Sequence, residues 1–285
     1  QYLPGTSIFR SSRRDVLYED DMEQFLRSTN PDLTADEITE IINRVKLAGS
    51  GSDFATLHMV YGWMVDGIQF TPQSGIARMV ELIHFDDAEK NIFRVVNQFT
   101  VEYINNGLTE NRRPDVLLYI NGLPLCVIEL KNPADADATV YDAWEQINIR
   151  YWRDIPHLLH YCPLACISDG VKTRLGTVRT PYEHFYAWRR VNDGDELSTL
   201  PFDELDTMIR GVYAPARFLE IFRDYIYFQD SEYDSDEVEI VCRYPQYFAS
   251  CLLKQSIIRS VQSGSGKGGT YFGATGCGKT YTMAF

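Results

Sequence analysis

The stretch RRPDVLLYINGLPLCVIELKNP, residues 112–133, decides the fold that we expect for this chain. Residues 113–120 and 123–131 are apolar runs bounded by turn residues, a pattern typical of strands. Asn121 and Gly122 separate the two runs, and Asn-Gly is a strong short-range signal for a hairpin turn. The pattern therefore predicts an antiparallel hairpin with an apolar body.

Polar residues stand at one end of this hairpin. Asp115 opens the first strand, whereas Glu129 and Lys131 close the second. Because successive strand residues point to opposite faces of a sheet, Glu129 and Lys131 share one face and Leu130 points into the opposite layer. We therefore expect Asp115, Glu129 and Lys131 to converge at one end of the sheet.

This combination of side chains suits the cleavage of a phosphodiester bond. Two carboxylates offer the oxygen ligands that Mg²⁺ prefers. The ion lowers the pKa of a bound water and neutralises charge on the phosphate, and a lysine beside it can orient that water or stabilise the transition state. We expect Mg²⁺ ligands at Asp115, Glu129 and Leu130. In the alternative interpretation, Asp115 caps a turn, and Glu129 and Lys131 are polar residues at an exposed strand end.

The residues before the hairpin predict a helical region followed by a strand. Two helices are expected within residues 15–48, and Thr34 with Glu37 is typical of a capping box at the start of the second. A third helix is expected within residues 53–65, and apolar residues recur at helical spacing over 76–83. Residues 91–104 are rich in β-branched and aromatic side chains, which predicts a strand.

The residues after the hairpin alternate between helical and extended patterns. The expected elements are a helix over 138–153, a strand over 164–168 with a turn at 169–170, a helix over 215–229, an acidic linker at 230–237, a helix over 243–260 and a loop at 263–269. Residues 172–198 have no clear pattern.

Composition and charge limit the function classes. The chain has 285 residues, of which 45% are hydrophobic and 13% aromatic, enough to fill a core. Its net charge of −13 argues against nucleic-acid binding, because DNA-binding proteins are expected to present a basic face, although charge distribution matters more than the sum.

The six cysteines fit no zinc pattern, so we expect free thiols in a reducing cytoplasm. No apolar stretch is long enough for a membrane span, and no signal peptide is evident, so we expect a cytoplasmic protein.

A second motif lies at residues 273–280, GATGCGKT, which match GxxxxGK[ST] at every fixed position. In such a loop, backbone N–H groups wrap the phosphates of ATP, Lys279 reaches the β- and γ-phosphates, and the Thr280 hydroxyl holds Mg²⁺. We expect a strand ending at residues 270–272 before the loop and a helix beginning near Lys279. The residues expected to bind the nucleotide are Gly273, Ala274, Thr275, Gly276, Cys277, Gly278, Lys279 and Thr280.

The hairpin motif resembles the PD-(D/E)xK nuclease superfamily. The resemblance implies that Asp115 and Glu129 hold the metal and that Lys131 assists the attacking water. In the branch related to recombination nucleases, the helix after the ExK strand carries a Gln with a Tyr one turn later. Gln146 and Tyr151 occupy the helix expected over 138–153, but their gap is one residue longer than the usual QxxxY. The alternative is a solvated glutamine and a packed tyrosine.

The order of motifs adds a second resemblance. RYPQYFA at 243–249 resembles the Q motif of superfamily 2 helicases, in which a glutamine, here Gln246, reads the adenine edge. Together with VLYEDDMEQFLRSTNPDL at 16–33, the hairpin and the phosphate-binding loop, this order is similar to the restriction (R) subunit of type I restriction–modification enzymes over nearly the whole chain. The family implies an ATP-driven translocase that pumps and cleaves double-stranded DNA. It also implies methyltransferase (M) and specificity (S) subunits as partners.

We therefore predict an α/β chain with an α+β nuclease core, in which helices flank a mixed β-sheet. Residues 1–230 are expected to form a nuclease domain with a helical N-terminal region. Residues 231–285 are expected to form a linker and the first element of a RecA-like motor domain. The predicted function is that of an Mg²⁺-dependent endonuclease in an ATP-driven restriction enzyme. The alternative is a P-loop DNA-remodelling or binding ATPase whose nuclease-like domain is inactive. Proximity of Asp115 and Glu129 would favour the first.

Overall fold

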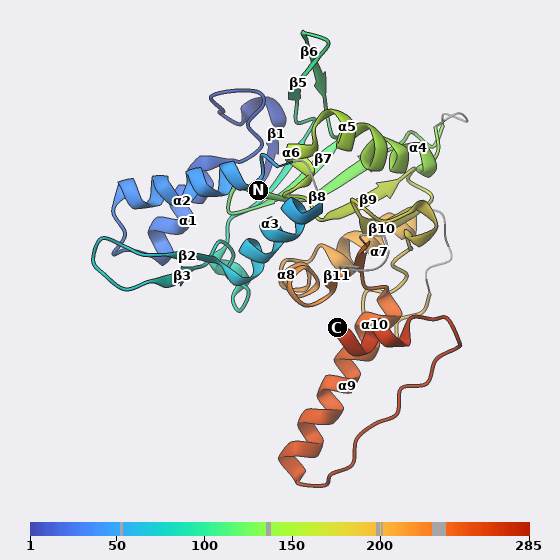
Figure 1. The fold of residues 1–285 in the computed structure, drawn as a ribbon. Coiled ribbons are helices and arrows are strands. Elements are labelled where there is room, and N and C mark those ends of the chain that lie inside the picture. Colours follow the sequence, from blue (N-terminus) through green and yellow to red (C-terminus); the bar gives the residue numbers. More distant parts are fainter. Residues whose placement is uncertain (52–53, 135–137, 198–199, 201, 230–237) are drawn as a thin grey trace.

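A mixed sheet of six strands carries the fold (Figure 1). The structure is a computed structural model that describes residues 1–51, 54–134, 138–197, 200, 202–229 and 238–285. The sheet has the strand order β1-β4-β7-β8-β9-β10. Its strands are β1 (Tyr2–Pro4), β4 (Phe93–Asn97), β7 (Val116–Ile120), β8 (Leu123–Leu130), β9 (Leu164–Ser168) and β10 (Thr173–Thr177). Two neighbouring pairs, β1–β4 and β8–β9, are parallel, and the others are antiparallel, which confirms the prediction of a mixed sheet flanked by helices.

The hairpin β7–β8 forms where residues 112–133 predict it. Asn121 and Gly122 have φ angles of 50° and 80°, the left-handed pair that a two-residue hairpin turn requires. A Cβ at Gly122 would lie 2.1 Å from the carbonyl oxygen of Tyr18, so only glycine fits this turn against the N-terminal region. The turn therefore joins the hairpin to the segment that leads into the first helix.

Helices cover both faces of the sheet (Figure 1). The parallel connection from β8 to β9 runs through α4 (Val140–Glu145), the π-helical segment η3 (Gln146–Tyr151), α5 (Trp152–Asp154) and α6 (Pro156–Leu159). Ala143 and Ile147 on this connection are fully buried. The opposite face is covered by α7 (Asp203–Val212) and α8 (Pro215–Asp224), which with the sheet line an apolar pocket of about 400 Å³. Leu130 lines that pocket, so its side chain lies on the face opposite to Glu129.

The N-terminal helices follow their sequence signals. They are α1 (Glu19–Thr29), α2 (Ala35–Ala48) and α3 (Phe54–Asp66). The Thr34 hydroxyl accepts a hydrogen bond from the N–H of Glu37, and a Glu37 carboxylate oxygen accepts one from the N–H of Thr34, which confirms the capping box. Helix formation here is therefore specified locally.

The helical spacing over residues 76–83 was a misleading signal. That region contains β3 (Arg78–Val80), which pairs with β2 (Ile68–Phe70). Pro72 and Gly75 form the intervening turn, with the Gly75 N–H bonded to the Pro72 carbonyl. Strand pairing and the burial of Val80 outweigh the short periodic pattern. Ile76, at the start of that pattern, is exposed in the structure.

Two further expected elements are divided in the structure. The strand expected over 91–104 is β4 and β5 (Val101–Asn105), which lie in different sheets, and β5 pairs with β6 (Leu108–Arg112) in a projecting hairpin (Figure 1). The helix expected over 215–229 ends at Asp224, and the following β11 (Ile226–Gln229) pairs with β12 (Val238–Val241). Pairing between distant segments decides this boundary. The acidic run 230–237 lies outside the described residues.

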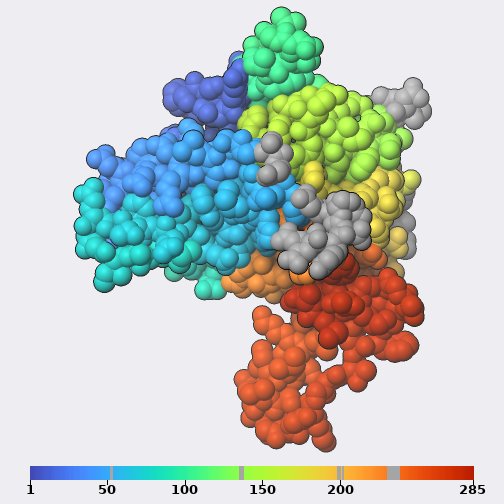
Figure 2. All heavy atoms as spheres, viewed as in Figure 1, coloured from blue at the N-terminus to red at the C-terminus, as the bar shows by residue number. Residues whose placement is uncertain are grey.

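Helix α9 (Tyr244–Ser263) projects from the body of the molecule (Figure 2). The last helix, α10 (Lys279–Ala284), lies back at the body beside the start of α9 (Figure 1). Residues 270–272 were expected to end a strand, but they have no regular secondary structure and pair with no strand in the described part of the chain. Among the described residues, no helix has both the length and the apolar character required to cross a bilayer.

Candidate active site

The register of the central hairpin brings two carboxylates together. β7 and β8 pair with Val116 opposite Ile128, and one step further in the same antiparallel register Asp115 lies beside Glu129. Lys131 follows directly after β8. The end of the hairpin therefore carries two acids and an amine at one edge of the sheet.

Glu129 is the most buried member of this group, with 2% of its surface exposed. The Tyr151 hydroxyl donates a hydrogen bond to Glu129 Oε2 at 3.0 Å, and Lys131 Nζ lies 3.5 Å from Glu129 Oε1. Burial, and next the nearby charge of Asp115, raise the pKa of Glu129 to about 8, although Lys131 and the Tyr151 hydrogen bond lower it. A proton or a cation is therefore favoured between the two carboxylates.

The Asp115 carboxylate is held by donors from both neighbouring strands. Asp115 Oδ2 accepts a hydrogen bond from the Leu130 N–H at 2.9 Å. Asp115 Oδ1 accepts one from the side-chain amide of Gln98 at 2.7 Å. The orientation of this carboxylate is thereby fixed from two sides.

The extra residue between Gln146 and Tyr151 is accommodated by the helix itself. Gln146–Tyr151 forms a π-helix, whose i→i+5 bonds give a wider turn than an α-helix. This turn brings residues five positions apart together, and Gln146 Nε2 donates to the Tyr151 hydroxyl at 2.8 Å. The longer spacing therefore does not separate the pair. Tyr151 is fully buried, and its hydroxyl is the group that reaches Glu129.

These side chains form a closed hydrogen-bond circuit. Lys131 Nζ donates to Gln146 Oε1 at 2.7 Å, Gln146 donates to Tyr151, and Tyr151 donates to Glu129. The 3.5 Å contact between Lys131 and Glu129 closes the circuit. It is longer than an ordinary hydrogen bond, so Gln146 rather than Glu129 is the main anchor of the ammonium group.

The oxygen atoms at this edge suit a hard divalent cation. Asp115 and Glu129 are the two carboxylates of the candidate site, and within the described residues no group of three or more His, Cys, Asp or Glu side chains could hold a metal. Leu130 can contribute only its main-chain carbonyl, because its side chain is apolar. Mg²⁺ commonly uses one or two carboxylates and retains several waters, which fits this donor set. The placement of Glu129 beside Asp115 favours a cation here, and burial together with the charge of Asp115 raises the pKa of Glu129.

The second motif forms a loop followed by a helix. Gly276 and Gly278 have φ angles of 80° and 81°, which favour glycine, and α10 begins at Lys279. Lys279 Nζ donates to the carbonyls of Gly273 and Ala274, each at 2.8 Å. Cys277 is half-buried. The exposed residues of the motif are Ala274, Thr275, Gly276 and Thr280.

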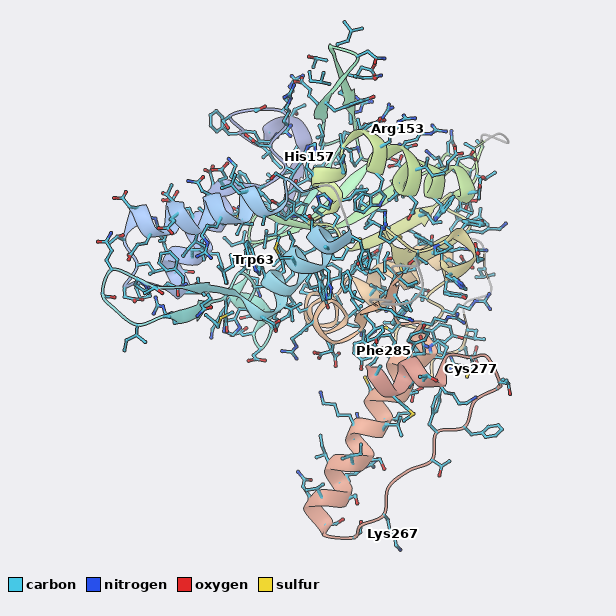
Figure 3. The ribbon with its side chains drawn as sticks, in the orientation of Figure 1. Trp63, Arg153, His157, Lys267, Cys277 and Phe285 are labelled. Atoms are coloured by element: carbon cyan, nitrogen blue, oxygen red, sulfur yellow. The ribbon has the colours of Figure 1, made fainter. Side chains whose placement is uncertain are left out.

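Gln246 lies against this loop. Its amide Nε2 donates to the Gly278 carbonyl at 3.0 Å, and its Oε1 accepts from the Arg243 N–H at 2.8 Å. A pocket of about 230 Å³ adjoins these residues and is also lined by Tyr186 and Tyr281. The fold thus brings the start of α9 and the glycine-rich loop together, and Cys277 lies near the body of the molecule whereas Lys267 lies at the far tip (Figure 3).

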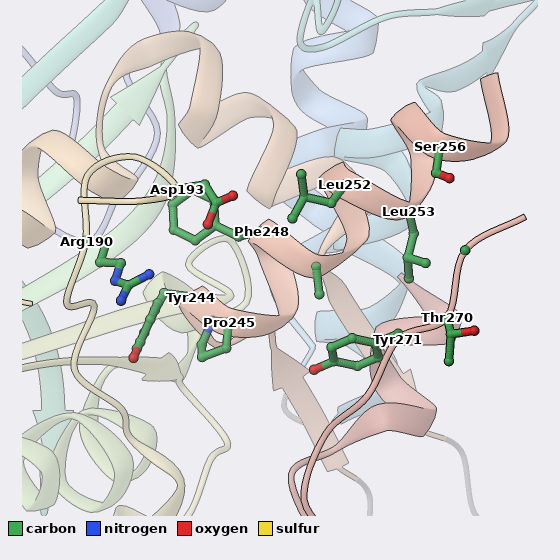
Figure 4. Close-up of a pocket in the computed structure, with 12 residues that line it drawn as sticks. Arg190, Asp193, Tyr244, Pro245, Phe248, Leu252, Leu253, Ser256, Thr270 and Tyr271 are labelled. Carbon is green, nitrogen blue, oxygen red and sulfur yellow. The ribbon is translucent and has the colours of Figure 1, made fainter. Parts of the chain in front are cut away.

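Cavity volume alone would point to a different place. A cavity of about 490 Å³ lies between α9 and residues 269–271, where Phe248, Leu252 and Tyr271 give it an apolar lining (Figure 4). None of the residues of the carboxylate site lines it. The convergence of titratable groups, rather than the size of a hollow, therefore identifies the candidate active site.

Sequence analysis missed Gln98. The residue lies seventeen positions before Asp115, and nothing in the pattern around it signals a polar role. Its φ angle is 51°, which is unusual for a residue other than glycine, and only the structure reveals this conformation.

Comparison with known proteins identifies relatives for nearly the whole chain. A family model described as "Type I restriction enzyme R protein N terminus" matches residues 2–184. A putative type I restriction enzyme MjaIXP endonuclease subunit of Methanocaldococcus jannaschii is 27% identical over 97% of this chain and 28% of its own length. The type I restriction enzyme HindI endonuclease subunit of Haemophilus influenzae is 26% identical over 97% of this chain and 26% of its own length. The chain therefore spans about a quarter of the length of these relatives.

Proposed function

This chain belongs to the family described as the N terminus of the type I restriction enzyme R protein, and from that premise we propose that it carries the Mg²⁺-dependent endonuclease site of such an enzyme. The substrate is the phosphodiester backbone of double-stranded DNA. The observation that carries the proposal is the convergence of Asp115, Glu129, Lys131, Gln146 and Tyr151 at one sheet edge through the hairpin register and the hydrogen-bond circuit.

Each side chain has a distinct part in the proposed chemistry. Asp115, Glu129 and the main-chain oxygen of Leu130 would hold Mg²⁺. When bound, the ion supplies a water of lowered pKa and neutralises charge on the phosphate. Lys131, anchored by Gln146, presents its ammonium beside the carboxylates, where it orients the attacking water or stabilises the developing negative charge.

Tyr151 and Gln146 support these groups. The Tyr151 hydroxyl donates to Glu129 and favours its ionised form. The Gln146 amide links that hydroxyl to the ammonium of Lys131. Because hydrogen bonds hold these groups in place, the site needs little rearrangement during the reaction. Such preorganisation is the usual source of electrostatic stabilisation of a transition state.

We further propose that residues 273–280 bind the phosphates of ATP and that Gln246 recognises the adenine. Lys279 would exchange its carbonyl partners for phosphate oxygens, and Thr280 would hold the nucleotide's Mg²⁺. In the longer protein, ATP-driven translocation would deliver DNA to the nuclease site. Methyltransferase and specificity subunits are the proposed partners.

The test compares variants of the full-length enzyme in its complex. Asp115→Ala, Glu129→Ala and Lys131→Ala should each reduce DNA cleavage by at least roughly 10²- to 10³-fold while ATP hydrolysis is retained. Glu145→Ala is the matched control, because Glu145 pairs with Arg150 on the same helical connection but faces solvent. Cleavage that survives all three site substitutions would mean that another part of the complex cuts the DNA and that the nuclease-like domain of this chain is inactive.

A further inference from the structure

Gln98 is the point at which the polypeptide leaves the central sheet beside the candidate site. It follows β4 directly and precedes the projecting hairpin β5–β6. Its N–H donates to the Asp115 carbonyl at 2.8 Å, and its side-chain Nε2 donates to Asp115 Oδ1 at 2.7 Å. Gln98 thus binds both the backbone and the carboxylate of one residue on the neighbouring strand.

The backbone of Gln98 adopts a conformation that glutamine rarely occupies. Its φ angle of 51° lies in the left-handed region, which is unfavourable for residues with a Cβ. Strained residues of this kind persist where the surrounding structure imposes them, and they cluster at functional sites. The observed strain is therefore a reason to ask what the side chain gains from this geometry.

The surroundings hold the bend in place. The Phe99 N–H donates to the Pro114 carbonyl at 3.3 Å. On the other side, a Cβ at Gly5 would lie 2.7 Å from the carbonyl oxygens of Asn97 and Gln98, so the N-terminal segment packs directly against the bend. The left-handed turn aims the Gln98 amide across the strand end at Asp115.

Asp115 has complementary constraints from its two sides. The Leu130 N–H comes from the backbone of β8, and a substitution cannot readily remove it. The Gln98 amide comes from a side chain and sets the rotation of the carboxylate about its own axis. Hydrogen bonds that orient a metal-binding carboxylate usually contribute strongly to metal affinity.

We propose that Gln98 is a positioning residue of the metal site: its amide fixes the rotamer of Asp115 so that the free lone pairs of this carboxylate face Glu129. The proposal rests on the proposed function, in which Asp115 is a metal ligand. Gln98 touches neither DNA nor metal in this role and acts only through Asp115.

Metal binding to the nucleotide-free full-length protein tests the proposal. Gln98→Gly permits the left-handed backbone and removes the side chain with its amide, and it should weaken Mn²⁺ binding, measured by isothermal titration calorimetry, by roughly 10-fold or more. Gln98→Glu should weaken it further, because a second carboxylate would face Asp115. The DNA-cleavage rate of Gln98→Gly should recover as the Mg²⁺ concentration is raised, whereas that of Asp115→Ala should not.

Asn106→Gly is the matched control. Asn106 also has a left-handed backbone, with φ 49°, but it lies in the turn between β5 and β6, away from the carboxylates. This variant should leave Mn²⁺ affinity and the Mg²⁺ dependence of cleavage unchanged. Unchanged Mn²⁺ affinity in Gln98→Gly, with binding lost in Asp115→Ala, would overturn the role of Gln98 alone. Unchanged affinity in Asp115→Ala as well would overturn the proposed metal site.

Discussion

The carboxylate site and the glycine-rich loop are constructed in opposite ways. At the sheet edge, Glu129 and Tyr151 are buried, and each polar side chain is oriented by another side chain. In the loop, Lys279 bonds to carbonyls of its own segment, and Thr280 is exposed. The first site is organised by tertiary packing, whereas the second is organised by local backbone geometry.

This difference has an energetic consequence. In the first site, burial disfavours the charged form of Glu129. The stability of the folded chain at this site therefore depends on protons and cations. In the loop, the Lys279 ammonium and the Thr280 hydroxyl lie near solvent. The free energy of binding an anion there therefore depends on exchanging weak local hydrogen bonds for bonds to that anion. The two regions should therefore respond to different perturbations.

The largest expected effect concerns the pH dependence of the metal-free protein. The folded-state pKa of Glu129 is about 8, against an ordinary value of 4.5. An acid with a raised pKa contributes stability at low pH that is lost as pH rises from about 4.5 to about 8, because the unfolded chain ionises first. A difference of one in pKa between the folded and the unfolded chain corresponds to roughly 1.4 kcal/mol. Glu129→Gln should therefore stabilise the metal-free protein by several kcal/mol at pH 8.5 and hardly at all at pH 4.

Thermal or urea unfolding in EDTA at the two pH values provides the measurement. Tyr151→Phe is the companion variant, because loss of its hydrogen bond to Glu129 should raise the pKa of that carboxyl further. An equal effect of Glu129→Gln at both pH values would show that Glu129 is not the titrating group and would remove the energetic contrast between the two regions.

An intermediate effect is expected at the loop. Lys279→Ala should weaken ATP binding to the full-length protein by roughly 10- to 100-fold, since hydrogen bonds to charged groups contribute about 1.5–3 kcal/mol. Titration with a fluorescent ATP analogue measures this affinity. Mn²⁺ binding in the absence of nucleotide should be unaffected, because Lys279 bonds to carbonyls of its own loop.

Lys267→Ala serves as the control for this variant. Lys267 is exposed at the far tip of the segment after α9 (Figure 3), so its removal should leave nucleotide affinity unchanged. Loss of nucleotide-free Mn²⁺ binding in Lys279→Ala would contradict the separation of the two sites.

The smallest effect should come from shortening the π-helix. Deletion of Ile149, which is 47% exposed, restores the usual four-residue step between Gln146 and Tyr151 and should convert the π-helical turn to α-helix. We expect DNA cleavage close to that of the unmodified enzyme and a change in unfolding free energy of about 1 kcal/mol or less. Deletion of the fully buried Ile147 is the contrasting variant and should cost roughly 2–5 kcal/mol. Loss of cleavage in the Ile149 deletion would show that the π-helix is itself required.

Signals that act within a few residues predicted the local structure well. Thr34 and Glu37 cap α2, and Asn121-Gly122 turns the central hairpin, because each depends on backbone geometry that neighbouring residues set. The alternation of side chains along β8 likewise predicted that Glu129 and Leu130 face opposite sides of the sheet. These features require no knowledge of distant segments.

Pairing between distant segments was less predictable. Residues 76–83 have helical spacing but contain a strand that pairs with β2, and Ile226 continues the pattern of α8 but pairs with Val241 of β12. In both places the strand partner lies outside the segment that carries the helical spacing. Residues 270–272 show the converse, since an extended pattern without a pairing strand forms no sheet.

By itself, the sequence determined the central hairpin, the approach of Asp115 to Glu129, the candidate residues of both sites and the family. It could do so because strand alternation and turn chemistry are short-range properties. Only the tertiary structure decided how those residues are held: the π-helix that aligns Tyr151 with Gln146, the raised pKa of Glu129 and the bond from Gln98 to Asp115. Those properties depend on burial and on contacts across strands, which arise only when the sheet and its covering helices are assembled.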